Sequence, residues 1–513
     1  MKKSILVITV ITAAMMELID TSIVNVALSH MSGNLGSTLE DTSWVITAYA
    51  IANIIVIPMT SFLTTKLGRR NYYIGSIIAF TFFSAMCGVA SNIWTLVLFR
   101  FLQGIGGGAL LSVSQAIVFE VYGKARAGIA SALFGVGVFL GPTIGPTLGG
   151  FITENYSWPW IFYINIPIGI TVAVSSILLV TEPEIKVTPK AVDWWGILLL
   201  IVGIGSLQTV LERGETDDWF SAGYIVALTV IAVFSILIFI WWELTIPNPV
   251  IDLRVLKSKS LAVAAILTAV TGVGLFTSVF LTPVLAQRVL GFPPTITGLT
   301  LLPGAILAIF GLLFSATLLK RGVSPLIIIT TGFVLFIIFS FLMSGLNLEA
   351  TPGNLARILI FRALGLAFLT VPLTALAVSG LDAKDVPQGS ALNNMMRQLG
   401  GSFGIAMINT YVAHRFGSHR NDLISDISIY NPQATQRING LTQYFAAKSG
   451  TMIEAQHKAL AVVNNGIDRQ SFLMSYLDAY IFVGLLFVLA MPLLLLVLDR
   501  KKQAAPVVLV SDH

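Results

Sequence analysis

Residues 135–150 read Gly135-Val-Gly-Val-Phe-Leu-Gly-Pro-Thr-Ile-Gly-Pro-Thr-Leu-Gly-Gly150. They lie inside an apolar segment, from about Ala127 to Ile152, that is long enough to cross a lipid bilayer as a helix. Glycines recur at every fourth position and therefore form one stripe along this helix: Gly137, Gly141, Gly145 and Gly149.

The glycine stripe predicts a close helix–helix contact, because no Cβ keeps a second backbone away. Pro142 and Pro146 each remove one helical hydrogen bond, which predicts a bent or pliable helix. Tight packing alone is one interpretation of this pattern. The repeated order of Gly-Pro pairs is more particular than tight packing alone requires.

The composition excludes a soluble globular protein. Of 513 residues, 56% are hydrophobic and only 11% are charged, and the mean hydropathy is +0.86. In soluble domains roughly 25% of residues are charged. Cys87 is the only cysteine, so no disulfide can form within the chain.

Fourteen apolar runs of membrane-spanning length follow one another along the chain. The first run carries Glu17 and Asp20 and has no evident cleavage site, so we interpret it as a retained helix rather than a signal peptide. An even number of spans places both termini on the same side. The runs cover about 5–28, 44–65, 72–90, 94–118, 127–152, 160–181, 192–212, 219–243, 260–287, 295–318, 324–346, 354–380, 388–413 and 471–498.

Basic residues gather in one set of short loops, and the opposite short loops hold almost none. By the positive-inside rule, both termini are expected in the cytoplasm. The basic pI of about 9.2 thus reports topology, and we expect no nucleic-acid partner. The basic set is Lys2, Lys3, Lys66, Arg69, Arg70, Lys124, Arg126, Lys186, Lys190, Arg254, Lys257, Lys259, Lys320, Arg321, Lys384, Arg500, Lys501 and Lys502.

An internal repeat relates the two parts of the chain. Residues 61–70 are echoed by 315–323, and Leu96-Val-Leu-Phe-Arg100 is echoed by Ile358-Leu-Ile-Phe-Arg362. This predicts an N-terminal six-helix half over 1–185, two extra helices within 186–257, and a C-terminal six-helix half over 258–513. In transporters built from parallel halves, the substrate path lies at the interface between them.

Several segments resemble one family of transporters, the fourteen-helix drug:proton antiporters (EmrB/QacA type) of the major facilitator superfamily. Residues 135–150 look like that superfamily's antiporter motif on the fifth helix. The other segments are Ile19-Asp-Thr-Ser-Ile-Val-Asn-Val-Ala-Leu28, Trp44-Val-Ile-Thr-Ala-Tyr49, Arg100-Phe-Leu-Gln-Gly104, Trp158–Gly169, Asp193-Trp-Trp-Gly196 and Asn393–Gly404. The resemblance is greatest to EmrB-type exporters and implies an all-α integral membrane protein with the major facilitator fold.

The loop after the second span departs from the superfamily pattern. Ser61 and Thr65 stand where that pattern usually has Gly and Asp, so the lock attributed to the Asp cannot be carried over. The basic part of the motif remains. Either cytoplasmic gating or simple anchoring by positive charge would account for Lys66, Gly68, Arg69 and Arg70.

Charges within spans are candidates for function, because each costs roughly 2.5–3.5 kcal/mol on insertion. Asp20 lies roughly 20 Å along the first helix, and burial there would favour proton exchange near neutral pH. Glu17 is on the same helix face and is either a second proton carrier or part of a wet cavity. Arg100 is the expected partner of Asp20, with snorkelling to the interface as the alternative. Arg362 and Arg397 are further intramembrane cations, and Arg397 could pair with a carboxylate or bind an anionic substrate.

Between the last two expected spans, residues 414–470 form the only long polar segment in the sequence. The predicted topology places this segment on the periplasmic side. Asn431-Pro-Gln resembles the matching loop of EmrB-type exporters, which work with a periplasmic adaptor and an outer-membrane channel. Contact with such an adaptor is one interpretation, and a lid without a partner is the other.

These features predict a proton-driven antiporter in the inner membrane that exports lipophilic or amphipathic compounds. We expect no enzyme activity, no metal and no cofactor. The expected energy source is the proton-motive force. The run Gln103–Gly108 lacks the Lys-Ser/Thr of a nucleotide-binding loop. A dedicated exporter of one metabolite, fatty acid or siderophore is the alternative, and a non-transporting membrane receptor is a third hypothesis.

Overall fold

The computed structural model describes residues 2–123, 127–182, 193–247, 249–381, 385–428, 430–449 and 451–495, and this part of the chain is helical with no strand. The basic residues at 124, 126, 186, 190, 384 and 500–502, and the expected boundary at 185/186, lie outside these ranges. The helices are α1 (Lys2–Leu35), α2 (Leu39–Leu67), α3 (Arg69–Gly88), α4 (Ile93–Tyr122), α5 (Ala127–Asn155), α6 (Trp160–Tyr163), α7 (Asn165–Leu179), α8 (Trp194–Arg213), α9 (Gly223–Thr245), α10 (Lys259–Val284), α11 (Pro294–Lys320), α12 (Pro325–Ser344), α13 (Pro352–Ser379), α14 (Val386–Ser425), α15 (Pro432–Ser449) and α16 (Met452–Ala490).

A helix lies at each range expected to span the membrane, with α6 and α7 together covering one. Eleven segments of the described chain are long and apolar enough to cross a bilayer. Helices α3 and α14 are not among them, and α2 offers only the shorter apolar stretch Asp41–Ile57. The chain is therefore a multi-pass membrane protein, and the number of fourteen spans stays a prediction.

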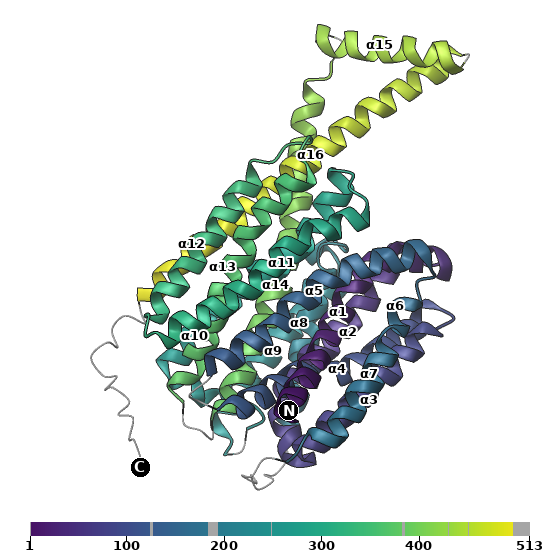
Figure 1. The fold of residues 1–513 in the computed structure, drawn as a ribbon. Helices are drawn as coiled ribbons and strands as arrows, with labels where there is room; N and C mark the ends of the chain where they lie inside the picture. The colour runs from purple at the N-terminus through teal and green to yellow at the C-terminus, as the bar shows by residue number, and fades with distance from the viewer. Residues whose placement is uncertain are drawn as a thin grey trace.

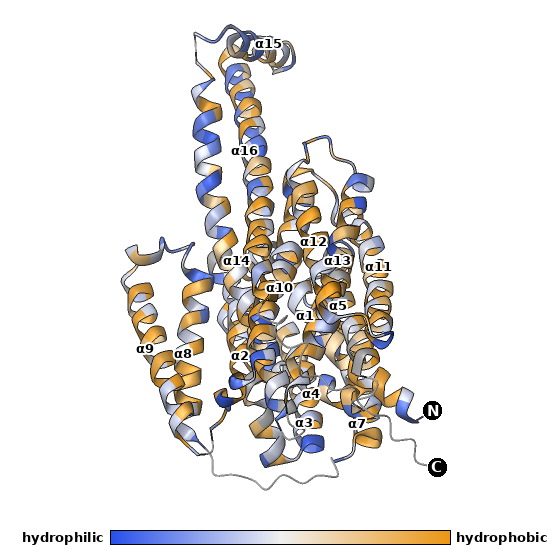
Figure 2. Ribbon diagram, turned by 90° about the vertical axis from the view of Figure 1, so that its left-hand side faces the viewer, coloured by the Kyte–Doolittle hydropathy of each residue, from blue (hydrophilic) through white to orange (hydrophobic). Residues whose placement is uncertain are grey.

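Helices α8 and α9 pack on each other at the side of the bundle, and α8 contacts α2 and α14. In Figure 2, α9 is apolar over most of its length, and α8 is apolar except toward one end. Phe234 and Trp241 on α9 are 61% and 63% exposed. A surface that is apolar all round suits contact with lipid rather than water.

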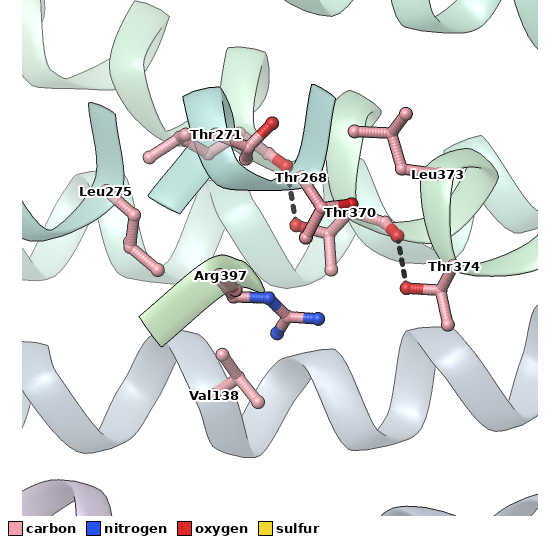
Figure 3. A pocket seen from close by; sticks show the side chains of 9 residues that line it. Val138, Thr268, Thr271, Leu275, Thr370, Leu373, Thr374 and Arg397 are labelled. Carbon is pink, nitrogen blue, oxygen red and sulfur yellow. Dashed lines mark hydrogen bonds between the residues drawn. The ribbon is translucent and has the colours of Figure 1, made fainter. Parts of the chain in front are cut away.

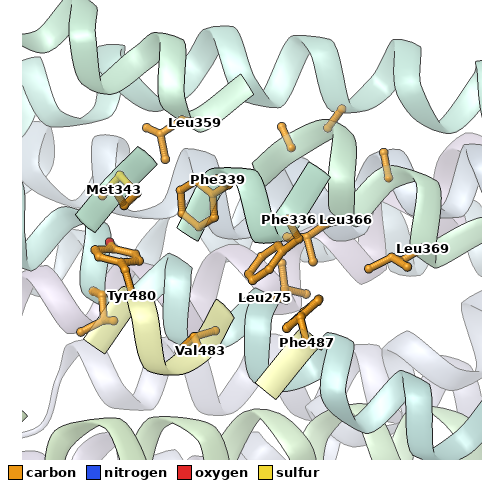
Figure 4. Close-up of a cluster of buried hydrophobic side chains, with 14 of the residues drawn as sticks. Leu275, Phe336, Phe339, Met343, Leu359, Leu366, Leu369, Tyr480, Val483 and Phe487 are labelled. Carbon is orange, nitrogen blue, oxygen red and sulfur yellow. The ribbon is translucent and has the colours of Figure 1, made fainter. Parts of the chain in front are cut away.

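Aromatic side chains on α12 and α16 lie within the large apolar core of the C-terminal part of the chain (Figure 4). The rings of Phe336 and Phe487 are stacked with their centroids 4.0 Å apart, and Phe339 meets Tyr480 edge to face at 5.7 Å. Such contacts fix α12 against α16.

Contacts between the first and second parts of the chain run mainly along α5, which packs against α11 and α13. Gly135 faces Leu312, and Gly298 faces Thr147, so small residues bring α5 and α11 close at two levels. Helix α14 also contacts α2 and α4. The helix carrying the glycine stripe is thus part of the main interface.

The segment 414–470 is not a loop over most of its length. Helix α14 continues to Ser425, α15 crosses beyond the bundle, and α16 returns (Figure 1). Stacked rings of Phe416 and Phe472, 4.1 Å apart, join the two long helices. Two pieces of this segment, 440–448 and 454–463, favour helix by their composition, and both lie in helices of the structure. The full extent of these helices is not evident from so polar a sequence, because their stability comes from packing between helices.

Candidate functional site: a buried ion pair between α1, α4 and α7

Asp20 on α1 and Arg100 on α4 form a fully buried ion pair. Arg100 Nη1 donates to Asp20 Oδ2 at 2.5 Å, and the two side chains are 1% and 0% exposed. The Arg100 Nε also donates to the Val45 carbonyl on α2 at 3.2 Å. Snorkelling of Arg100 to the membrane interface is therefore wrong, because its guanidinium points into the protein.

Two uncharged amides complete the shell around Asp20. Gln103 Nε2 and Asn165 Nδ2 donate to Asp20 Oδ1 at 3.1 and 2.8 Å. Gln103 Oε1 in turn accepts from Arg100 Nη1 at 2.8 Å. The carboxylate therefore receives hydrogen bonds from α4 and from the start of α7, which offsets part of the cost of burying it.

Tyr49 on α2 connects this pair to the second carboxylate. The Arg100 guanidinium lies over the Tyr49 ring, 4.2 Å from its centroid, a favourable cation–π geometry. The Tyr49 hydroxyl donates to Glu17 Oε1 at 3.4 Å, and Asn53 Nδ2 donates to the same oxygen at 2.9 Å. Glu17 Oε2 is buried and has no hydrogen-bond partner among the described residues.

The glycine stripe of α5 packs on the helix that carries Asp20. A Cβ at Gly141 would lie 2.6 Å from the Leu18 Cβ, and one at Gly149 would lie 2.8 Å from Ile23 Cγ1. A Cβ at Gly145 would overlap the Ser22 hydroxyl. Gly137 faces Ile11 and Met15, and both Pro142 and Pro146 lie inside the continuous helix.

The glycine run of α4 has a packing role. A Cβ at Gly104 would lie 2.6 Å from the Tyr49 carbonyl oxygen, and one at Gly106 would lie 2.7 Å from the Phe80 nitrogen. This run brings α4 against α2 and α3, and it positions Tyr49 beneath Arg100.

The basic loop joins α2 to α3 at Gly68, whose φ of 81° lies in the left-handed region that favours glycine. The backbone N–H groups of Arg69 and Arg70 donate to the Glu182 carboxylate at 3.0 and 3.1 Å. An anion at a helix N-terminus is stabilised by free N–H groups and by the helix dipole.

Side chains of the same loop contact the surrounding helices. The Arg69 guanidinium pairs with Glu120 on α4, and the Lys66 ammonium lies 5.8 Å from the centre of the Trp194 ring on α8. Glu120 and Glu182 are acidic partners that sequence analysis missed, because both are remote from the loop along the chain.

Arg362 and Arg397 lie apart from the Asp20 centre. Arg362 Nη1 donates to the Ser278 carbonyl at 3.3 Å, and Arg397 Nη2 donates to Asn394 Oδ1 at 3.1 Å. Neither forms an ion pair within the described part of the chain. The expected alternative of a carboxylate partner for Arg397 is not found there.

Sequence analysis also missed the uncharged members of the site, Gln103, Asn165 and Asn53. A signal was present, since each is an amide inside an apolar span. Polar side chains in such positions are typical of helix–helix hydrogen bonds.

Comparison with known proteins places this architecture in context. The model of a family described as Major Facilitator Superfamily matches residues 10–405. The multidrug export protein EmrB of Escherichia coli K12 is 34% identical over 488 residues, which cover 94% of each chain. The fatty acid resistance protein FarB of Neisseria gonorrhoeae is 30% identical over 483 residues, covering 94% of this chain and 93% of FarB.

Solved structures agree on the fold. The human organic anion transporter MFSD10 superposes with a TM-score of 0.59 at 12% identity, covering 96% of this chain and 99% of MFSD10. A bacterial homologue of the lysosomal transporter Spinster gives 0.57 at 14% identity, covering 96% of both chains. On these grounds, the chain belongs to the major facilitator superfamily of transporters and is similar to the EmrB multidrug export proteins.

Proposed function

We propose that the protein is a proton-driven antiporter that exports lipophilic or amphipathic compounds by alternating access. Relatives described as multidrug export and fatty acid resistance proteins, aligned over more than nine-tenths of the chain, support export of such compounds. The observation that carries proton coupling is the buried Asp20–Arg100 pair in the middle of α1.

In this proposal Asp20 is the proton-carrying group. Protonation removes the negative charge that Arg100 faces, which leaves a buried guanidinium without its counter-ion. Because an unpaired buried charge is costly, the pair must rearrange when the proton binds. Helix α1 packs on the glycine stripe of α5, and α5 packs on α11, so a shift at Asp20 reaches the interface between the two halves.

Glu17 is a second proton site in this proposal. It lies one helical turn from Asp20, and Tyr49 contacts both centres. The loop with Lys66, Gly68, Arg69 and Arg70 acts as a cytoplasmic clamp. Thr65 has no carboxylate that could lock this loop. In its place the Glu182 carboxylate accepts hydrogen bonds from the N-terminus of α3.

We also propose the division into halves at 1–185 and 258–513 with linker helices between them, an inner-membrane location and cytoplasmic termini. The outer end of α14, α15 and the first part of α16, residues 414–470, form a projection that we call the α14–α16 hairpin. This hairpin would then extend into the periplasm. Its exposed apolar residues make it a docking surface for a periplasmic adaptor that leads to an outer-membrane channel.

The first experiment compares wild type with Asp20→Asn in an efflux-deficient Gram-negative strain, at matched membrane abundance, by drug susceptibility and dye efflux. We expect protection in wild type that is abolished by the substitution and by a protonophore. Glu349→Gln, which neutralises an exposed acid, is the matched control and is expected to behave like wild type.

Protection that survives Asp20→Asn unchanged would refute the role of Asp20. Absence of protection against every compound tested would favour a dedicated exporter of one metabolite.

A further inference from the structure

A pocket between the two halves holds Arg397 (Figure 3). The guanidinium of Arg397, from α14, points toward Val138 on α5, and threonines of α10 and α13 line the same space. A second hollow shares Arg397, Val138 and Leu275 and continues toward Leu18 and Leu111 on α1 and α4. The pocket and the second hollow together border helices of both halves, and the second hollow reaches the helix that carries Asp20.

Among the described residues, Arg397 is bound by an amide side chain rather than by an acid. It is 8% exposed, and Asn394, its partner at 3.1 Å, donates in turn to Gln115 Oε1 on α4 at 2.5 Å. A guanidinium has five N–H donors, and among the described residues one of those of Arg397, on Nη2, has a hydrogen-bond partner. This contrasts with Arg100, which has a carboxylate and two further acceptors.

The threonines beside Arg397 differ in how their hydroxyls are used. The hydroxyls of Thr271, Thr370 and Thr374 donate to backbone carbonyls of their own helices. Thr268 is 3% exposed, and its Oγ1 has no partner among the described residues. A hydroxyl donor and a cation that have, respectively, no acceptor and no counter-ion among the described residues therefore line the same pocket.

Apart from Arg397, Asn394, Gln398 and the threonines, the lining of the pocket and the second hollow is apolar. Arg397 and Thr268 offer donors at one place, while the neighbouring wall suits a hydrocarbon or aromatic group. The apolar lining comprises Leu18, Leu111, Val138, Pro142, Leu275, Phe276, Leu366 and Leu373.

We propose that Arg397 and Thr268 form the head-group subsite for an amphipathic organic anion, a carboxylate with an apolar tail. Arg397 would bind the carboxylate through two parallel N–H donors, and the Thr268 hydroxyl would donate to the same group. A cationic head group would be repelled. This inference rests on the proposed export function and names the substrate class of that transporter.

Equilibrium binding to the detergent-purified protein tests the subsite without any transport step. The probe is 11-(dansylamino)undecanoic acid, and its methyl ester is the neutral control, with binding followed by dansyl fluorescence. Hydrogen bonds to a charged group predict that wild type binds the acid roughly tenfold to a hundredfold more tightly than the ester.

Arg397→Gln is expected to lower affinity for the acid to that for the ester, while affinity for the ester stays unchanged. Arg397→Lys should keep part of the preference, because it retains the charge but not the planar pair of donors. Arg357→Gln removes an exposed arginine from α13 and should bind like wild type.

Equal binding of acid and ester by wild type would overturn the proposal, and this comparison needs no variant. An acid preference that persists in Arg397→Gln would overturn it too. Displacement of the probe by dodecanoic acid supports a free amphiphile. Displacement by dioleoyl phosphatidylglycerol alone would reassign the site to a lipid head group and overturn the substrate class.

The test also separates this subsite from the export function. If binding prefers the acid and depends on Arg397 but the protein confers no protection in cells, the export function is refuted and the subsite is supported. If protection depends on Asp20 but binding shows no preference for the acid, the subsite is refuted and the export function is supported.

Discussion

Asp20 and Arg100 show how a membrane protein keeps two charges away from water. Removing each ion from water costs several kcal/mol, and the mutual attraction offsets this only when the remaining polar groups also find partners. Here Gln103 and Asn165 supply them, and the Tyr49 ring covers the guanidinium. The charge balance of this site is therefore shared by side chains from four helices.

At this scale we predict that Arg100→Gln destabilises the protein by about 3–5 kcal/mol, because it leaves Asp20 buried and unpaired. The double variant Asp20→Asn/Arg100→Gln should recover most of that loss, since neither charge remains. Thermal unfolding of the purified protein in detergent measures both. A double variant as unstable as the single one would show that packing, rather than charge, sets the cost.

At the scale of elements, the α1–α5 contact depends on glycines of α5, which have no side chain to keep α1 away. Glycines on one face of α5 let the α1 backbone approach, and the two prolines leave the helix with fewer internal hydrogen bonds. Helix α5 also contacts α11, so one helix connects α1, which carries Asp20, to the C-terminal part of the chain.

We predict that Gly145→Ala destabilises the protein by about 1–3 kcal/mol through overpacking against Ser22, and that it lowers dye efflux. Gly75→Ala on α3 is the matched control, because a Cβ there meets nothing within 4 Å. In that exposed helical position alanine should be neutral or stabilise by roughly 0.5–1 kcal/mol. Identical melting curves for the two variants would refute the role of the stripe in packing.

At the scale of the whole molecule, the outer end of α14, α15 and the first part of α16 project beyond the bundle (Figure 1). Arg415 and His419 contact Asp478, at 2.5 and 2.8 Å, and Arg420 contacts Asp468 at 2.7 Å. These pairs and the stacked rings order the stalk. Tyr430, Met452 and Ile453, at the two ends of α15, are 87%, 66% and 71% exposed.

Exposed apolar residues on an ordered stalk suit a protein partner. We predict that Tyr430→Ser/Met452→Ser/Ile453→Ser abolishes drug protection in cells while leaving transport in proteoliposomes within twofold of wild type. Gln433→Ser/Gln456→Ser alters exposed polar residues of the same hairpin and should protect normally. Full protection by the triple variant would contradict an adaptor contact at this surface.

The membrane character and the candidate charges could be predicted from the sequence, because insertion of a helix into lipid depends on its own composition. The apolar runs located a helix at every expected span, and Asp20 and Arg100 stood out as charges inside them. The family was recognisable because its motifs are short contiguous segments that can be compared without knowing the fold.

The expected pairing of Arg100 with Asp20 is confirmed, although 80 residues separate them in sequence. Only the tertiary structure decided which uncharged groups join that pair, such as Asn165, which lies 145 residues from Asp20. The Glu182 contact at α3, the amide partners of Arg397 and the helical order of 414–470 likewise depend on packing between distant helices. Local composition sets whether a segment enters the membrane, whereas the pairing of buried polar groups depends on how all the helices pack together.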